Sequence, residues 1–154
     1  MKLGTLKMAG AMLFLCMLMA CEGEQQQNVD WVSVDDEKIM DYLAENNISA
    51  EKHPSGIYYR ITKQGNGQHP NSTNIVVANY TGYLLDGTVF DQGTGAEFPL
   101  TNVIQGWQIG IPLLSKGGSG QLFIPSYLAY GSRPPTSAIP RNSVLIFDVE
   151  LLNF

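Results

Sequence analysis

The side chains in this 154-residue chain that could form a functional site are mainly aromatic, and they lie among glycines and prolines. Aromatic side chains that line a cleft bind an apolar ligand, and a carboxylate among them can supply one of the few polar contacts. The candidates are Tyr80, Tyr83, Phe90, Phe98, Trp107, Tyr127, Tyr130 and Phe147. This composition predicts a pocket for an apolar group rather than a site for nucleophilic or metal chemistry.

The groups required by more familiar reactions are missing from the sequence. Its two histidines, His53 and His69, each precede a proline and belong to no cluster with metal-ligand spacing. Ser119 does not lie in the Gly-x-Ser-x-Gly turn of serine hydrolases. The paired glycines lack the third glycine and the flanking elements of a dinucleotide-binding loop. We therefore expect neither a metal nor a cofactor.

Strands are expected to position the aromatic residues, because the chain after residue 54 consists of β-branched and aromatic runs separated by turns. The predicted strands cover residues 56–62, 75–85, 88–90, 121–125 and 144–152. Asp86-Gly87 is a typical hairpin turn between the second and third of them. A short helix is predicted over residues 102–111, ended by Pro112. The last strand has too little polar alternation to be exposed on both faces. The pattern predicts an α+β fold with an antiparallel sheet.

The first 20 residues have the layout of an export signal, with two lysines followed by an apolar run over residues 8–19. That run is too short for the roughly 20 residues of a membrane-spanning helix. Residues 18–21, Leu-Met-Ala-Cys, resemble the lipobox of bacterial lipoproteins, in which the cysteine becomes the lipid-modified first residue. Lipidation of Cys21 would remove an unpaired exposed thiol from an exported protein. An ordinary secretory signal with a chance cysteine is the alternative.

The formal charge of −5 is unevenly distributed. Residues 22–51 carry nine acidic side chains and one lysine, whereas residues 52–154 carry six basic and five acidic side chains. The chain lacks the basic surface that binds a phosphate backbone, so nucleic acid is not an expected partner. We expect residues 21–32 to form a flexible acidic tether, because they contain too few apolar side chains to fold alone.

Residues 33–54 are expected to form a short helix and a linker. Ser33 is the predicted N-cap, acids at 35–37 would lie in the first turn, and the helix would end near Asn46 or Asn47. Ile39, Tyr42 and Leu43 form one apolar stripe. A lone helix of this length is marginally stable. The stripe should therefore pack on the rest of the chain or on a second copy, which would form a homodimer through residues 33–47.

Five blocks resemble the FKBP-type peptidyl-prolyl cis/trans isomerases, and they occur in the family's order. They are VANYTG (77–82), LDGTVFD (85–91), VIQGW (103–107), IPSYLAYG (124–131) and IPRNSVLIFDVEL (139–151). The resemblance implies an isomerase domain over residues 55–154. Its fold would be a twisted antiparallel β-sheet wrapped over one short α-helix.

The resemblance also implies a site. The catalytic positions would be Tyr80, Asp91, Trp107 and Tyr130, and the substrate-binding positions Phe90, Phe98, Val103, Ile104, Ile139 and Phe147. Trp107 would lie under the substrate proline ring, with Tyr80, Phe90 and Phe147 as walls. The Ile104 amide and the Tyr130 hydroxyl would donate to substrate carbonyl groups, and the Tyr80 hydroxyl would hold Asp91.

The implied function is a prolyl isomerase, lipid-anchored at the bacterial cell envelope, that assists the folding of exported proteins. Its partners would be proline-containing unfolded or nascent exported polypeptides, and the family's macrolide inhibitors. The alternative is a membrane-tethered chaperone or binding module of the same fold with weak or no isomerase activity. Ala96 replaces a second aromatic wall of the family, so one rim of the pocket should be more open. Residues 132–137 replace the family's usual loop over the site, and both departures leave substrate preference and macrolide affinity open.

Overall fold

A computed structural model of the chain describes residues 29–154. The predicted export signal, the lipobox and Cys21 lie outside the described residues. The predicted tether is described only from Val29 onward.

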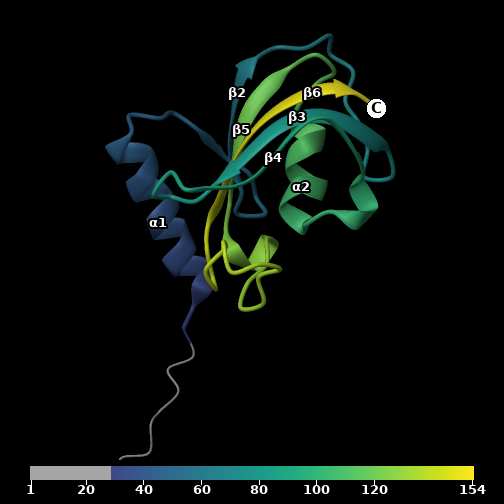
Figure 1. Cartoon of the computed structure of the whole chain (residues 1–154). Coiled ribbons are helices and arrows are strands. Elements are labelled where there is room, and N and C mark those ends of the chain that lie inside the picture. Colours follow the sequence, from purple (N-terminus) through teal and green to yellow (C-terminus); the bar gives the residue numbers. More distant parts are fainter. Residues whose placement is uncertain (1–28) are drawn as a thin grey trace, which may run out of the picture.

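A single six-stranded antiparallel sheet forms the centre of the fold, with the strand order β1-β2-β5-β6-β3-β4 (Figure 1). The strands are β1 (Glu51–Lys52), β2 (Tyr58–Lys63), β3 (Ile75–Tyr83), β4 (Val89–Pro99), β5 (Ser119–Ile124) and β6 (Leu145–Asn153). The predicted hairpin is confirmed: Leu84 donates its amide to the Thr88 carbonyl, and Gly87 has a φ of +84°. Strand β4 is much longer than predicted, because its glycine-rich second half still pairs with β3.

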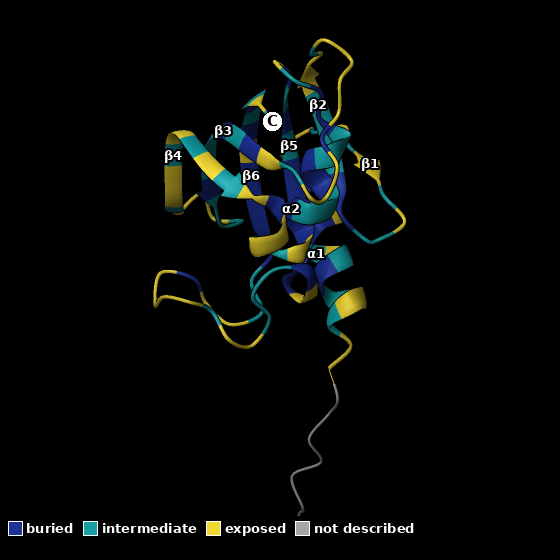
Figure 2. Ribbon diagram, turned by 90° about the vertical axis from the view of Figure 1, so that its right-hand side faces the viewer, coloured by how far each residue is buried: buried dark blue, intermediate teal, exposed yellow. Residues whose placement is uncertain are grey.

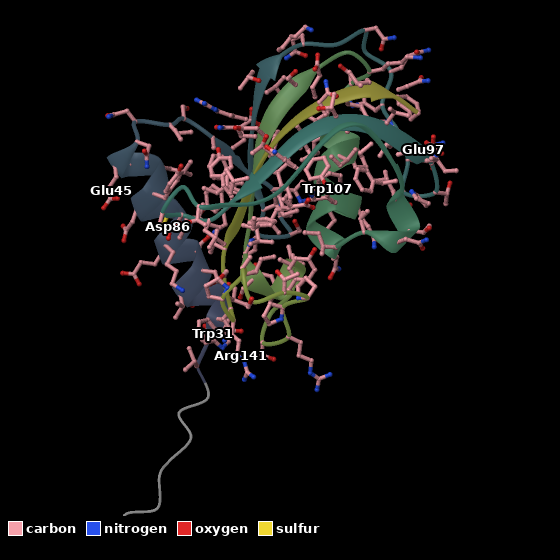
Figure 3. All side chains as sticks on the ribbon, viewed as in Figure 1. Trp31, Glu45, Asp86, Glu97, Trp107 and Arg141 are labelled. Atoms are coloured by element: carbon pink, nitrogen blue, oxygen red, sulfur yellow. The ribbon has the colours of Figure 1, made fainter. Side chains whose placement is uncertain are left out.

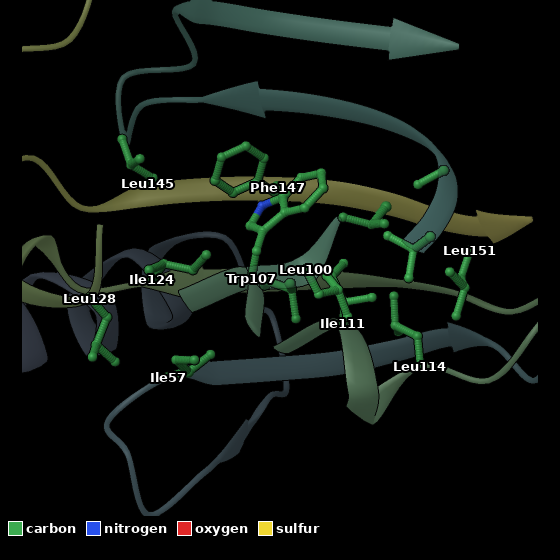
Figure 4. Close-up of a cluster of buried hydrophobic side chains, with 14 of the residues drawn as sticks. Ile57, Leu100, Trp107, Ile111, Leu114, Ile124, Leu128, Leu145, Phe147 and Leu151 are labelled. Carbon is green, nitrogen blue, oxygen red and sulfur yellow. The ribbon is translucent and has the colours of Figure 1, made fainter. Parts of the chain in front are cut away.

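The helix α2 (Gln105–Gly110) packs on one face of the sheet and closes the main core. Four alternate side chains of β6 belong to that core: Leu145, Phe147, Val149 and Leu151. They pack in one cluster with Trp107 of α2 and with Ile111, which directly follows α2 (Figure 4). Helix α2 is shorter than predicted. It ends at Gly110, just before Pro112, and Pro112 lies in the 3₁₀ turn Ile111–Leu113 that follows. A proline is tolerated at this position because the first backbone amides of a helical turn have no hydrogen-bond partner within it, so the amide that proline lacks is not needed.

The helix α1 (Trp31–Glu45) packs on the opposite face of the sheet, at one end. Its buried Ile39 and Leu43 contact a second cluster that includes Phe123 of β5 and Ile146 of β6. Figure 2 shows buried and exposed residues on different sides of this helix. The predicted apolar stripe is confirmed, and it packs on the chain's own sheet. Strand β6 is thus covered on both faces at this end, as its apolar sequence predicts.

The start of α1 differs from the prediction. The N-cap is Asp30, whose carboxylate accepts from the Val32 amide (3.1 Å) and the Ser33 hydroxyl (2.7 Å). Ser33 therefore lies inside the helix, and the first turn contains no acidic residue. Asp30 and Ser33 can both act as caps, and the ionised carboxylate is the stronger acceptor. Residues 31 and 32, which we expected in the tether, are helical. The predicted end of the helix is confirmed, with Asn46 as the C-cap.

Within residues 29–154, no helix is both long enough and apolar enough to cross a membrane.

Candidate active site

A cavity of about 280 Å³ opens between α2 and the strands that cross above it. Its lining residues come from β3, β4, the segment before α2, α2 itself, the loop after β5, and β6. They are Tyr80, Phe90, Asp91, Phe98, Asn102, Val103, Ile104, Trp107, Tyr130 and Phe147. The structure therefore gathers into one cavity nine of the ten residues expected there.

Ile139 is the exception. Its side chain is buried in the main core, in the cluster that also contains Trp107 and Phe147, and it does not line the cavity. Asn102 lines the cavity but was not predicted. An exposed asparagine before a short helix has no distinctive sequence signal, so only the fold reveals its position.

Trp107 forms the base of the cavity and is only 4% exposed. Its indole lies between α2 and the sheet (Figure 3), next to Phe147 (Figure 4). Three aromatic rings meet its indole nearly edge to face, those of Tyr80, Phe98 and Phe147, each with a centroid distance of 5.3 Å. Edge-to-face contacts are the preferred geometry of aromatic pairs. The base and walls of the cavity therefore support one another and keep an apolar shape before any ligand enters.

Gly82 makes room for two of these walls. A Cβ atom at this position would lie 2.7 Å from both the Phe90 and the Phe147 rings, well inside van der Waals contact. The centroids of the two rings are 5.6 Å apart and the ring planes are at 88° to each other, next to the space that Gly82 leaves free. The glycine on β3 thus allows rings from β4 and β6 to converge at the cavity.

Asp91 is the one carboxylate on the cavity, and it is held in a fixed position. Its Oδ2 accepts a hydrogen bond from the Tyr80 hydroxyl (2.8 Å), and its Oδ1 accepts from the Gln92 amide (2.9 Å). Burial, followed by the hydrogen bond to Asp91, raises the pKa of Tyr80 to about 12. Tyr80 therefore remains a protonated donor throughout the physiological pH range.

Tyr130 lies at the cavity on the loop that follows β5. Burial and then the charge of Asp91 raise the pKa of the Tyr130 hydroxyl. The hydroxyl thus stays protonated at neutral pH and can donate to a ligand. Ile104 is the N-cap of α2, and its carbonyl accepts from the Trp107 backbone amide (2.9 Å).

A larger hollow, of about 710 Å³, lies on the outer face of the sheet. Its lining is mainly polar and includes Asn79, Gln121, Asp148 and Glu150, several of which already bond to one another. Tyr80 is its one aromatic lining residue, so it lacks an aromatic enclosure that would exclude water from a bound group. The smaller aromatic cavity is therefore the better candidate for a site that binds an apolar ligand.

Curated relatives are similar to a large part of this chain. An FKBP-type isomerase called FkpA from Aeromonas hydrophila is 46% identical over 118 residues, which are 73% of this chain and 44% of the relative. The 22 kDa FKBP-type isomerase of Escherichia coli is 46% identical over 102 residues, 64% of this chain and 50% of the relative. The chain thus spans half or less of the length of these relatives.

Solved structures have the same fold. The crystal structure of FkpA from Escherichia coli superposes with a TM-score of 0.68 at 36% identity, covering 79% of this chain and 60% of that one. The crystal structure of AtFKBP13 superposes with a TM-score of 0.63 at 33% identity, covering 68% of this chain and 98% of that one. The predicted FKBP-like fold is confirmed.

The family model for "FKBP-type peptidyl-prolyl cis-trans isomerase" matches residues 66–152, a range that includes every residue lining the aromatic cavity. The match covers more than half of this chain, and the chain therefore belongs to the FKBP-type peptidyl-prolyl cis-trans isomerase family.

Proposed function

We propose that this protein accelerates the cis-trans isomerisation of X-Pro bonds in unfolded or nascent polypeptides. The observation that carries the proposal is the aromatic cavity based on Trp107, with one fixed carboxylate and a tyrosine hydroxyl beside it. Such a cavity accepts a proline ring and presents few, well-oriented polar groups to the backbone next to it. The relatives' names, which describe isomerases, support the same reaction.

The reaction needs no nucleophile. Rotation about the peptide bond crosses a barrier of roughly 18–20 kcal/mol because the amide loses its resonance. Uncatalysed X-Pro exchange therefore takes about tens to hundreds of seconds. A water-excluding pocket weakens the hydrogen bonding that favours the planar, charge-separated amide, and fixed donors can stabilise the twisted geometry.

Each of the nine predicted site residues that line the cavity has a role in this proposal. Trp107 supports the proline ring, and the walls around it are Tyr80, Phe90, Phe98, Val103 and Phe147. The Ile104 amide and the Tyr130 hydroxyl donate hydrogen bonds to substrate carbonyl groups, while Asp91 contributes the negative charge of the site. An acceleration of about a millionfold would require about 8 kcal/mol from these contacts.

The test is the exchange rate of short X-Pro peptides, measured by NMR in the presence of the full chain. We expect Asp91→Ala and Trp107→Ala to lower the acceleration at least about tenfold, because each removes a group that acts on the twisted bond. Thr94→Ala is the matched control, since Thr94 lies on β4 but lines the outer hollow. It should leave the rate unchanged.

The same measurement separates the proposal from its alternative. A folded chain that does not accelerate exchange for any residue before proline would instead be a binding or chaperone module of the same fold. A loss of equal size in Thr94→Ala would also contradict the proposal, because the rate would then depend on general stability rather than on the cavity.

We also propose that the protein is exported and tethered to the cell envelope through a lipid on Cys21. The basis is the lipobox-like sequence at residues 18–21. A relative from Legionella longbeachae, 39% identical over 104 residues, bears the name "Outer membrane protein MIP". Metabolic labelling with a fatty acid should mark the full chain and not Cys21→Ala. An unlabelled wild-type chain would contradict the anchor.

A macrolide inhibitor of the family would occupy the aromatic cavity and compete with the peptide. Neither Ala96 nor residues 132–137 line this cavity, which supports a more open rim. We therefore expect weaker macrolide inhibition than in relatives that have a second aromatic wall. An inhibition constant equal to theirs would contradict this.

A further inference from the structure

Asp35 is the one charged residue of the described chain whose side chain is completely buried. It lies on α1, outside the range that the family model matches. Burial of a carboxylate is costly unless hydrogen bonds replace its water. Its Oδ2 accepts two such bonds, from the Ser126 amide (2.8 Å) and the Ser126 hydroxyl (2.6 Å). Lys38 lies 3.8 Å from its Oδ1.

Ser126 in turn shapes the loop that carries Tyr130. It begins a 3₁₀ turn, Ser126–Leu128, directly after β5. The Ser126 carbonyl accepts from the amides of Ala129 (3.0 Å) and Gly131 (2.9 Å), the two neighbours of Tyr130 in the sequence. Asp35 therefore holds the amide and side chain of Ser126, while the Ser126 carbonyl holds the backbone on both sides of Tyr130.

Figure 1 shows the first turns of α1 close to this green segment after β5. A second polar tie of α1 lies elsewhere, at Asp36. Its carboxylate accepts from the Tyr58 hydroxyl on β2 (2.8 Å) and forms an ion pair with Lys52 on β1 (2.6 Å). The two ties both hold the helix on the sheet, but only the one from Asp35 continues to a residue of the cavity.

We propose that Asp35 is a positioning residue for Tyr130, so that α1 belongs to the catalytic unit. This inference rests on the isomerase activity proposed above. Asp35 fixes Ser126, Ser126 fixes the backbone at residues 129–131, and the fixed backbone holds the Tyr130 hydroxyl where it donates to the substrate.

The test is a double-mutant cycle between Asp35 and Tyr130 in the full chain, read as kcat/KM for an X-Pro peptide. Asp35→Asn should lower kcat/KM about fivefold in the wild-type background and less than about twofold in the Tyr130→Phe background. The two losses should overlap because both substitutions act through the Tyr130 hydroxyl. Tyr58→Phe is the matched control: it removes the hydrogen bond from β2 to Asp36 and should leave kcat/KM unchanged.

Ser126→Ala provides a second path to the answer if Asp35→Asn does not fold. It removes only the hydroxyl bond to Asp35, and its loss of kcat/KM should likewise shrink in the Tyr130→Phe background. Equal losses in both backgrounds would overturn the positioning role while leaving the isomerase proposal intact. A wild-type chain without any acceleration would instead overturn the isomerase proposal, and with it a catalytic role for Asp35.

Discussion

Tyr80 combines two tasks on one side chain. Its ring meets both Trp107 and Phe98 edge to face, and its hydroxyl donates to Asp91. The ring helps to shape the cavity, whereas the hydroxyl orients the carboxylate. Because the two tasks use different atoms, they can be separated by replacing tyrosine with phenylalanine.

We expect Tyr80→Phe to keep the fold and lower kcat/KM about fivefold, because loss of one hydrogen bond is worth about 1 kcal/mol. Thr81→Ala, at the next position on β3 and facing the outer hollow, is the control. An unchanged kcat/KM in Tyr80→Phe would mean that Asp91 does not need this donor.

The raised pKa of Tyr80 also predicts how stability depends on pH. The folded chain raises this pKa from 10.0 to about 12, so the stabilisation is fully present below pH 10 and is lost as the pH rises toward 12. The unfolding free energy, measured by urea titration, should fall over this interval. The fall should be shallower in Tyr80→Phe, and an identical slope would contradict the assignment.

At the level of elements, α1 and α2 occupy opposite faces of one sheet and stabilise it in different ways. Helix α2 supplies the base of the cavity, through Trp107. Helix α1 covers the other face of β5 and β6 through Ile39 and Leu43. It is therefore an integral layer of the domain rather than a linker in front of it.

Replacement of Ile39 by alanine should destabilise the whole domain by about 2–5 kcal/mol, because its side chain is fully buried between α1 and the sheet. Met40→Ala on the same helix is the matched control: its side chain is 49% exposed, and the change should cost less than about 0.5 kcal/mol. Thermal unfolding of both variants measures the difference. Similar shifts would contradict the docking of α1.

For the whole molecule, the position of α1 changes what a homodimer would require. The stripe at Ile39 and Leu43 is already covered, and the large apolar side chains left exposed on α1 are Val32 and Met40. A typical stable interface buries about 1,600 Å² in total, far more than two such side chains provide. The predicted homodimer through residues 33–47 would have to recruit other surfaces.

We therefore expect the chain to sediment as a monomer, and Met40→Glu to leave its mass unchanged. A dimer that dissociates in Met40→Glu would show that the outer face of α1 is an interface, within the predicted segment but on the face opposite the apolar stripe. A dimer that persists in this variant would place the contact on another surface.

The sequence by itself predicted an antiparallel sheet and both helices from local signals, and the resemblance to the family supplied nine of the ten expected cavity residues. The hairpin at Asp86-Gly87, the apolar strand β6 and the ordered family blocks are each contained within a few adjacent residues. The tertiary structure alone decided three points: Asp30 rather than Ser33 caps α1, Asn102 lines the cavity, and Ile139 does not. It alone also joined Asp35 to Ser126, which lie 91 positions apart. A buried carboxylate chooses its partner by where the chain brings donors together in space, and no periodicity or spacing in the sequence records that choice.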